Sequence, residues 1–317
     1  EHGSQLLHAW EVRAARNSYF GPGRYGRLPL VTTFYGIRML RGLPRHQPLV
    51  LGLGALLGDG RAFGHQDVSL IEPPVNTATD APGRGDGAGF RREHGIRDDE
   101  LLLAIVTRLV PALEKDAGAE LTVEAVRQLD DPRVRLVVVG AGPSLERLRT
   151  RAASANAALG RQAVLVPGQL ADPRPAYDAA DIVLGMGGSA LRGLAFAKPV
   201  VVHGAAGYTA VHEPGPLVEP HASRCMYGFG DGSRVPDPLV AQLRGLLDDP
   251  DRRARLGAWG REWVDGRFSL DGVTTAFEDL YARVLARPAR VTGWLKDLEQ
   301  MTRYEFTKPA ALRLLGR

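Results

Sequence analysis

Hydrophobic residues gather in short runs along the chain, and stretches with a helical period lie between the later runs. Apolar or β-branched runs predict strands at 30–34, 68–71, 102–106, 135–139, 163–166, 182–184 and 200–202. Amphipathic patterns predict helices at 119–129, 145–159, 190–197 and 237–247, a closely spaced helical pair over 250–285 and a short helix over 309–315. Uninterrupted apolar strands that alternate with helices are typical of parallel sheets, so we predict an α/β fold of Rossmann-like units.

A stretch rich in Pro, Gly, Asp and Thr at 72–89 divides the chain into two blocks. The second block carries at least five of the predicted strands by residue 202, whereas the first carries about three. The first block is small for such a domain, so we expect it to be incomplete. Because the sequence does not begin with Met, we also expect it to start inside a longer protein.

Composition narrows the class of protein. With 317 residues, 44% of them hydrophobic, the chain can form one or two domain cores. Its 40 basic and 36 acidic residues give a net charge of +4, which favours no nucleic-acid partner and allows a mild attraction to anionic ligands or membrane surfaces. The single cysteine, Cys225, excludes an internal disulfide framework. The sequence shows neither a spanning apolar run nor a signal peptide, and its Arg-rich, Ala-rich usage suggests a GC-rich bacterial genome, so we predict a cytoplasmic protein.

Two cations follow the strand predicted at 102–106. Arg108 and Lys115 lie between this strand and the next helix, and ligands bind at the carboxyl ends of strands in open α/β sheets. A bidentate guanidinium and a compact ammonium suit a diphosphate, and Lys115 is one of only four lysines in the chain. The alternative is that both are solvated surface charges.

Two glycine loops follow later strands. Gly140 and Gly142 open one helix, and Gly187, Gly188 and Ser189 open another. Glycines let the backbone approach a ligand closely, and the amides of a helix N-terminus favour anions. For Gly140 and Gly142 the alternative is a tight turn that needs glycine only for its geometry, and without a third glycine this loop does not support NAD binding.

Arg192 lies on the first turn of the helix that follows Ser189. It can reinforce a negative ligand at that helix start, or it can pair with a surface carboxylate. The eight histidines form no metal-ligand spacing and no G-x-S-x-G motif is present, so we expect neither a metal site nor a serine nucleophile.

Taken together, these loops resemble the donor half of the two-domain nucleotide-sugar glycosyltransferases with the GT-B fold, specifically the large retaining family. Segments that carry the resemblance are the V-G-x-G-P turn at 139–143, residues 166–170 and 177–184, the A-x-G-x-P-V-V-like helix exit at 195–201, and, upstream, 8–11, 30–36 and 68–76. The chain departs from the family where two glutamates are expected eight positions apart, since both are missing and Arg192 stands at the second.

The resemblance implies roles for particular residues. Arg108 and Lys115 would neutralise the donor diphosphate, and Gln169 and Leu170 would border the base. The loop with Gly187, Gly188 and Ser189 would add amide donors. His8 and Glu11 would lie near the reacting carbon, although the second histidine of the family falls on Trp10 here.

The resemblance also implies a domain division and an activity. Residues 1–77 with 300–317 would form the acceptor-side domain and 78–299 the donor domain. The chain would transfer a sugar from a nucleoside diphosphate such as UDP to a small-molecule, glycan or lipid acceptor, with retention, without a metal or other cofactor, and in peripheral contact with a membrane. A nucleotide-sugar epimerase of the same fold and a non-catalytic nucleotide-binding homologue are the alternatives.

Overall fold

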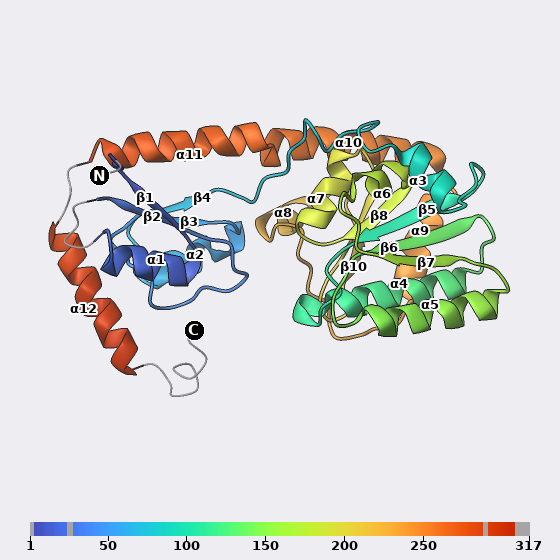
Figure 1. Cartoon of the computed structure of the whole chain (residues 1–317), viewed down its shortest axis with the longest axis horizontal. Helices are drawn as coiled ribbons and strands as arrows, with labels where there is room; N and C mark the ends of the chain where they lie inside the picture. Colours follow the sequence, from blue (N-terminus) through green and yellow to red (C-terminus); the bar gives the residue numbers. More distant parts are fainter. Residues whose placement is uncertain (1–2, 24–27, 288–290, 308–317) are drawn as a thin grey trace. The chain divides into compact units, whose positions relative to one another are not determined.

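The structure is a computed structural model that describes residues 3–23, 28–287 and 291–307, and it divides into two compact units (Figure 1). Unit 1 comprises Glu1–Pro73 and Asp271–Arg317, and unit 2 comprises Pro74–Leu270. The sequence placed the corresponding boundaries at 77/78 and 299/300. The largest difference concerns residues 271–299, which the structure assigns to unit 1.

Unit 1 is built on a parallel sheet of four strands in the order β1-β2-β3-β4. The strands are β1 (Leu7–Trp10), β2 (Leu30–Phe34), β3 (Leu49–Leu51) and β4 (Val68–Leu70). The predictions for β2 and β4 are confirmed. The first block holds four strands instead of about three, because the short β1 and β3 give little signal in the hydrophobic pattern.

Helices cover both faces of this sheet. They are α1 (Glu11–Phe20), α2 (Leu57–Ala62), α11 (Leu270–Leu285) and α12 (Val291–Thr307). Figure 1 shows α11 over one face, with α1 and α2 on the other. Val273, Leu280 and Val284 of α11 pack against Val31 and Val50 of the sheet, which explains why the helix belongs to unit 1.

The carboxylate of Asp297 anchors α12 to the loop before β3. Asp297 is fully buried and accepts hydrogen bonds from the backbone amides of Arg45 (2.7 Å) and His46 (3.0 Å). The His46 ring also contacts it at 2.8 Å through Nδ1. The helix predicted at 309–315 lies outside the described residues.

Unit 2 is built on a six-stranded sheet in the order β10-β9-β8-β5-β6-β7. Its strands are β5 (Leu101–Val106), β6 (Val134–Val139), β7 (Val164–Gly168), β8 (Ile182–Gly185), β9 (Val200–His203) and β10 (Thr209–Val211). All pairs are parallel except β9 with β10, a short antiparallel strand that the sequence did not reveal. Strands β6 and β7 follow β5 on one side of it, and the next strand in the sequence, β8, pairs with β5 on its other side.

The helices of unit 2 form a layer on each face of its sheet. They are α3 (Gly87–Glu93), α4 (Lys115–Leu129), α5 (Leu145–Leu159), α6 (Arg174–Ala179), α7 (Gly188–Ala195), α8 (Val218–Ser223), α9 (Asp237–Leu247) and α10 (Pro250–Phe268). Helices α4, α5 and α9 lie on one face, and α3, α6, α7 and α10 on the other (Figure 1). The predictions for α5 and α9 are confirmed, whereas α4 and α7 begin four and two residues earlier than predicted.

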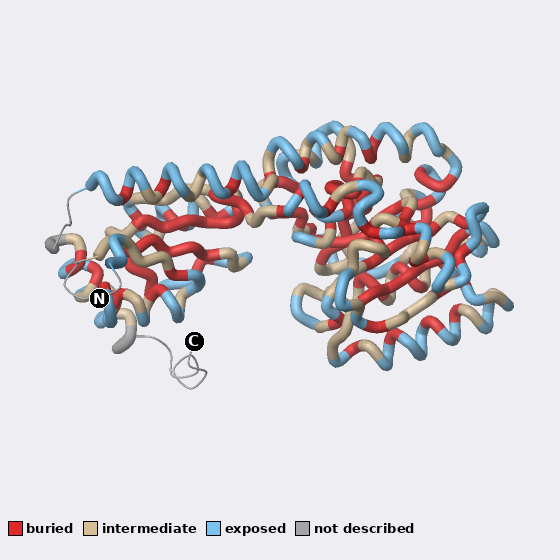
Figure 2. Tube along the Cα trace, turned by 45° about the horizontal axis from the view of Figure 1, so that its top comes forward, coloured by how far each residue is buried: buried red, intermediate tan, exposed pale blue. Residues whose placement is uncertain are grey.

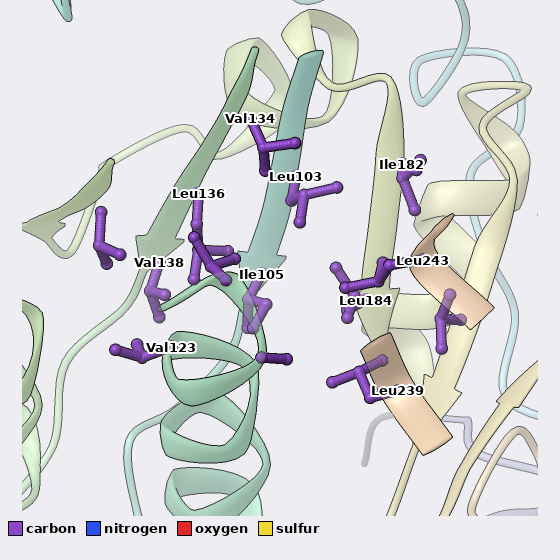
Figure 3. Close-up of a cluster of buried hydrophobic side chains, with 14 of the residues drawn as sticks. Leu103, Ile105, Val123, Val134, Leu136, Val138, Ile182, Leu184, Leu239 and Leu243 are labelled. Atoms are coloured by element: carbon purple, nitrogen blue, oxygen red, sulfur yellow. The ribbon is translucent and has the colours of Figure 1, made fainter. Parts of the chain in front are cut away.

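The inner strands β5, β6, β8 and β9 are buried on both faces over almost all of their length, as the predicted parallel sheet requires (Figure 2). Leu103, Ile105 and Val138 meet Val123 of α4 and Leu243 of α9 in the core shown in Figure 3. No helix among the described residues has the length and apolar character needed to cross a membrane.

At the outer edge of β7, one side chain occupies the backbone groups of Val164. Asn156 of α5 donates from Nδ2 to the carbonyl oxygen of Val164 (2.9 Å) and accepts from its amide at Oδ1 (2.8 Å). Both outward-facing backbone groups of Val164 are therefore satisfied.

Candidate functional site

A cavity of about 720 Å³ opens in unit 2 at the carboxyl ends of β5, β6, β7 and β8. Its centre lies where the strand order reverses between β5 and β8, the position at which open α/β sheets bind ligands. Eight of the predicted site residues line it, namely Arg108, Gly140, Gly142, Gln169, Leu170, Gly188, Ser189 and Arg192. The fold therefore brings together loops that lie up to 84 positions apart in the sequence.

The glycines after β6 allow two loops to pack closely. Gly140 and Gly142 have φ values of +153° and +152°. A Cβ on Gly140 would lie 1.8 Å from the carbonyl oxygen of Thr107, and one on Gly142 would lie 2.2 Å from that of Leu109. Their close neighbours are thus protein backbone, so the turn geometry alone requires glycine. The packing fixes the loop that carries Arg108 beside the cavity.

Arg108 and Lys115 carry positive charges that no carboxylate of the described residues neutralises. Arg108 is exposed and lines the cavity, and Lys115 is half-buried as the first residue of α4. Burial lowers the pKa of Lys115, and the nearby charge of Arg108 lowers it further. Among the described residues, neither side chain forms an ion pair. Lys115 does not line the cavity; it begins α4, which follows the loop that carries Arg108.

A strained segment precedes Lys115. Leu113 and Glu114 both have left-handed backbone conformations, with φ of 59° and 53°. The Glu114 carboxylate accepts a hydrogen bond from the amide of Ala206 (3.0 Å) and pairs with Arg234 (2.9 Å). These contacts hold the start of α4 against the loop that follows β9 and support the strained backbone.

The start of α7 forms another wall of the cavity. Gly187 has a φ of 57°, and a Cβ there would lie 2.7 Å from the Tyr227 hydroxyl. Gly188 is exposed, with open space where a side chain would stand. The Tyr177 hydroxyl donates to Ser189 Oγ (3.1 Å). The first amides of α7 thus border the cavity, although Gly187 itself does not line it.

Arg192 pairs with a carboxylate that the sequence analysis did not identify. Its Nε lies 3.1 Å from Asp80, whose side chain is 5% exposed against 46% for Arg192. Asp80 also lines the cavity. Arg261 fixes its segment by donating to the carbonyl oxygens of Thr77 (2.7 Å) and Asp80 (2.9 Å). Pairing with a surface carboxylate is the alternative role that the sequence predicts for Arg192. Arg192 does pair with a carboxylate, but that carboxylate is buried and lines the cavity.

His8 and Glu11 lie in unit 1, within β1 and at the start of α1. His8 Nδ1 lies 2.6 Å from the Tyr281 hydroxyl, and Nε2 lies 2.8 Å from Thr33 Oγ1. Burial lowers the pKa of His8. Glu11 has a left-handed φ of 68° and accepts a hydrogen bond from the amide of Tyr35 (3.0 Å). Both side chains are held in place by their own unit.

Within the part of the chain that the structure describes, potential metal ligands are scattered. Across residues 3–23, 28–287 and 291–307, no group of three His, Cys, Asp or Glu side chains has a suitable arrangement.

Comparison with known proteins finds relatives of this chain. Residues 101–228 match the family described as glycosyl transferases group 1. The chain is 32% identical over 247 residues to the D-inositol 3-phosphate glycosyltransferase of Kineococcus radiotolerans, covering 71% of this chain and 54% of that protein. It is 28% identical to a GDP-mannose-dependent alpha-(1-6)-phosphatidylinositol monomannoside mannosyltransferase of Mycobacterium tuberculosis, covering 69% and 57%. The chain thus spans about half the length of these relatives.

Solved structures share the fold. A glycosyltransferase from Rickettsia africae superposes with a TM-score of 0.72 at 16% identity, covering 90% of this chain and 78% of that one. Anabaena Alr3699/HepE in complex with UDP-glucose gives a TM-score of 0.67 at 15% identity, covering 88% and 79%. These matches confirm the predicted fold class and the predicted resemblance to glycosyltransferases.

Proposed function

Because the chain resembles the group 1 glycosyl transferases in sequence over residues 101–228 and the solved glycosyltransferases in fold, we propose that it transfers a sugar from a nucleoside-diphosphate sugar to an acceptor. Unit 2 would bind the donor in its cavity, and unit 1 would bind the acceptor. A cytoplasmic location remains a prediction from the sequence.

One observation carries this proposal. Arg108 brings a positive charge to the switch point of the sheet, Lys115 carries a second one that interacts with it, and no carboxylate of the described residues pairs with either of them. Such a site leaves its charge available for an anionic ligand with two phosphates. The charge on the diphosphate grows as the bond to the sugar breaks, so preorganised cations stabilise the transition state.

The remaining walls of the cavity suit the other parts of a donor. The amides at Gly188 and Ser189 face it from the start of α7 and would add donors to a phosphate oxygen. Gln169 and Leu170 follow β7 and would border the base. We propose that these cations and amides neutralise the leaving group without a metal ion, and that no other cofactor takes part.

The acceptor and the stereochemistry complete the proposal. The names of the two curated relatives support an inositol-containing small molecule or lipid as acceptor. His8 and Glu11 would lie on the acceptor side, near the reacting carbon. Transfer would retain the configuration of the sugar, with the leaving phosphate guiding the acceptor from the same face.

Calorimetric titration with UDP, GDP, ADP and dTDP tests donor binding, and substitution tests the two cations. We expect one nucleotide to bind, and Lys115→Ala to weaken that binding about tenfold because a charge-assisted contact is lost. With a matching donor and acceptor, the same variant should lower turnover by about a hundredfold. Arg244→Ala is the matched control, since Arg244 is exposed on α9, away from the cavity.

The outcomes separate the alternatives. Nucleotide affinity and turnover that Lys115→Ala leaves unchanged would contradict the assignment of the diphosphate site. Donor conversion without any acceptor would indicate an epimerase. Nucleotide binding without turnover on any acceptor would indicate a binding protein, and failure of all four nucleotides would refute the proposed function.

A further inference from the structure

A cavity of about 790 Å³ lies in unit 1, at the end of the sheet where the strands begin. Leu30 is the first residue of β2, and Pro48 and Asp67 directly precede β3 and β4. Glu11 instead follows β1 at the opposite end of the parallel strands. The described residues that line the cavity all belong to unit 1. This cavity is therefore separate from the donor cavity of unit 2 and from the side to which we assign the acceptor.

Two aromatic side chains form an apolar part of its wall. Trp294 of α12 and Tyr19 of α1 are both buried, and their rings stack with centroids 5.6 Å apart. The Tyr19 hydroxyl donates to the carbonyl oxygen of Trp294, which fixes the start of α12 against α1. Val284, near the end of α11, also lines the cavity. This wall is preformed and can pack against the C–H groups of a ligand.

His46 contributes an oriented imidazole ring to the cavity wall. Its Nδ1 lies 2.8 Å from the carboxylate of Asp297, which also accepts hydrogen bonds from two backbone amides. An ionised carboxylate only accepts hydrogen bonds, so Nδ1 carries the proton, and Nε2 of the neutral ring is an acceptor. Within the described residues Nε2 has no hydrogen-bond partner, and it can therefore accept from a hydroxyl group of a ligand.

Three glutamines add neutral polar groups to the same cavity. Gln5, Gln47 and Gln66 line it, and in the described part of the chain none of their side-chain amides forms a hydrogen bond. Each amide can both donate and accept, as a hydroxyl group does. Uncommitted amides of this kind suit a ligand that carries several hydroxyl groups.

Two cations also line the cavity. Lys296 forms no ion pair among the residues that the structure describes. Arg287 shares the carboxylate of Asp67 with Arg283, whose Nη1 lies 3.0 Å from it, so one acid faces two arginines. A phosphate monoester carries about two negative charges at pH 7 and can meet both Lys296 and Arg287. A single carboxylate, with one charge, matches this pair less well.

We propose that this cavity binds a sugar phosphate. The phosphate lies against Lys296 and Arg287, the hydroxyl groups bond to His46 and the three glutamines, and the ring packs on the apolar wall at Trp294. Such a ligand links the strand ends to α11 and α12, so it also stabilises unit 1. The inference goes beyond the proposed function, because it concerns unit 1 alone and requires no transfer reaction.

Calorimetric titration of the full chain with glucose 6-phosphate, glucose and inorganic phosphate tests this inference. We expect glucose 6-phosphate to bind at least about tenfold more tightly than either of the others, since each lacks one set of contacts. It should also raise the melting temperature of unit 1 in scanning calorimetry. Lys296→Gln should weaken its binding about tenfold through the loss of a charge-assisted contact, and Gln66→Ala about fivefold through the loss of a neutral one.

Two control variants separate this cavity from other sources of binding. Arg38→Gln removes an exposed positive charge on the loop after β2, outside the cavity, and should leave the affinity for glucose 6-phosphate unchanged. Lys115→Ala should leave it unchanged too, whereas Lys296→Gln should not affect any nucleotide affinity. Lys296 and Gln66 are exposed, so both substitutions are compatible with folding, which circular dichroism verifies.

Several results would overturn the inference. These are no binding of glucose 6-phosphate, equally tight binding of glucose, equal losses for Lys296→Gln and Arg38→Gln, and a loss in Lys115→Ala alone, which would place the ligand in unit 2. A chain that binds no nucleotide but binds glucose 6-phosphate through Lys296 would refute the proposed function and leave this inference standing.

Discussion

The ion pair of Asp80 and Arg192 allows a quantitative test of how the cavity is built. Arg192→Gln removes the cation, and the carboxylate of Asp80 then stays buried without its charged partner. Two unit charges 3.1 Å apart attract by about 5 kcal/mol at an effective dielectric constant of 20. Because Arg192 is 46% exposed, water screens much of this attraction, and we expect a loss of about 2 kcal/mol of unfolding free energy.

Asp80→Asn should cost less than Arg192→Gln. Arg192 can turn its guanidinium to solvent when the carboxylate is gone, so we expect about 1 kcal/mol. The double variant should then cost less than the sum of the single variants, with a coupling free energy of about 1 kcal/mol or more. For a unit of this size, a loss of 2 kcal/mol lowers the melting temperature by about 4 to 8 °C.

Scanning calorimetry of the four proteins measures these values in the transition of unit 2. The surface pair of Glu124 and Arg127 on α4 is the matched control, since both side chains are well exposed and should show no resolvable coupling. Single variants without effect, or strictly additive losses at Asp80 and Arg192, would refute the role given to this pair.

Three further predictions concern other parts of the molecule. Gly140→Ala should destabilise unit 2 by at least about 2 kcal/mol in urea unfolding, because its Cβ would collide with the carbonyl oxygen of Thr107; an unchanged midpoint would contradict this packing. Burial lowers the pKa of His212 to about 3 and that of His221 to about 4, below the ordinary 6.5. Stability should therefore be complete above pH 6.5 and fall by at least about 2 kcal/mol by pH 5, whereas in His212→Gln the melting temperature should depend less on pH. Asp297→Ala should destabilise unit 1 by about 3 kcal/mol, since buried amides lose their acceptor, and an unchanged unfolding curve would show that α12 is held by other contacts.

Much of the fold is evident from the sequence because its signals are local. Long helices such as α5 and α9 have strong periodicity, and their bounds match the prediction. The strands β3 and β10 have only three residues each, and their hydrophobic pattern does not distinguish them from loops. The assignment of α11 to unit 1 depends on which sheet its apolar face meets, and a periodic pattern does not contain that information.

The candidate site was likewise predictable only where its residues carry a local signal in the sequence. Strand ends identify Arg108 and the glycine loops, because parallel strands bring their carboxyl ends to one edge. Asp80 gives no such signal, since it follows no strand and meets Arg192 only after the linker folds onto α7. Tyr177 and Tyr227 are missed for the same reason, as each reaches the start of α7 from a different loop or helix.

The side chain of Asn156 has a consequence for association between molecules. An edge strand with open backbone groups is a template on which a strand of another chain can add, and such addition begins aggregation. At β7 an incoming strand would first have to displace both hydrogen bonds between Asn156 and Val164. One amide side chain thus opposes edge-to-edge polymerisation at Val164, in a strand that also carries Pro167, a residue without an amide to donate.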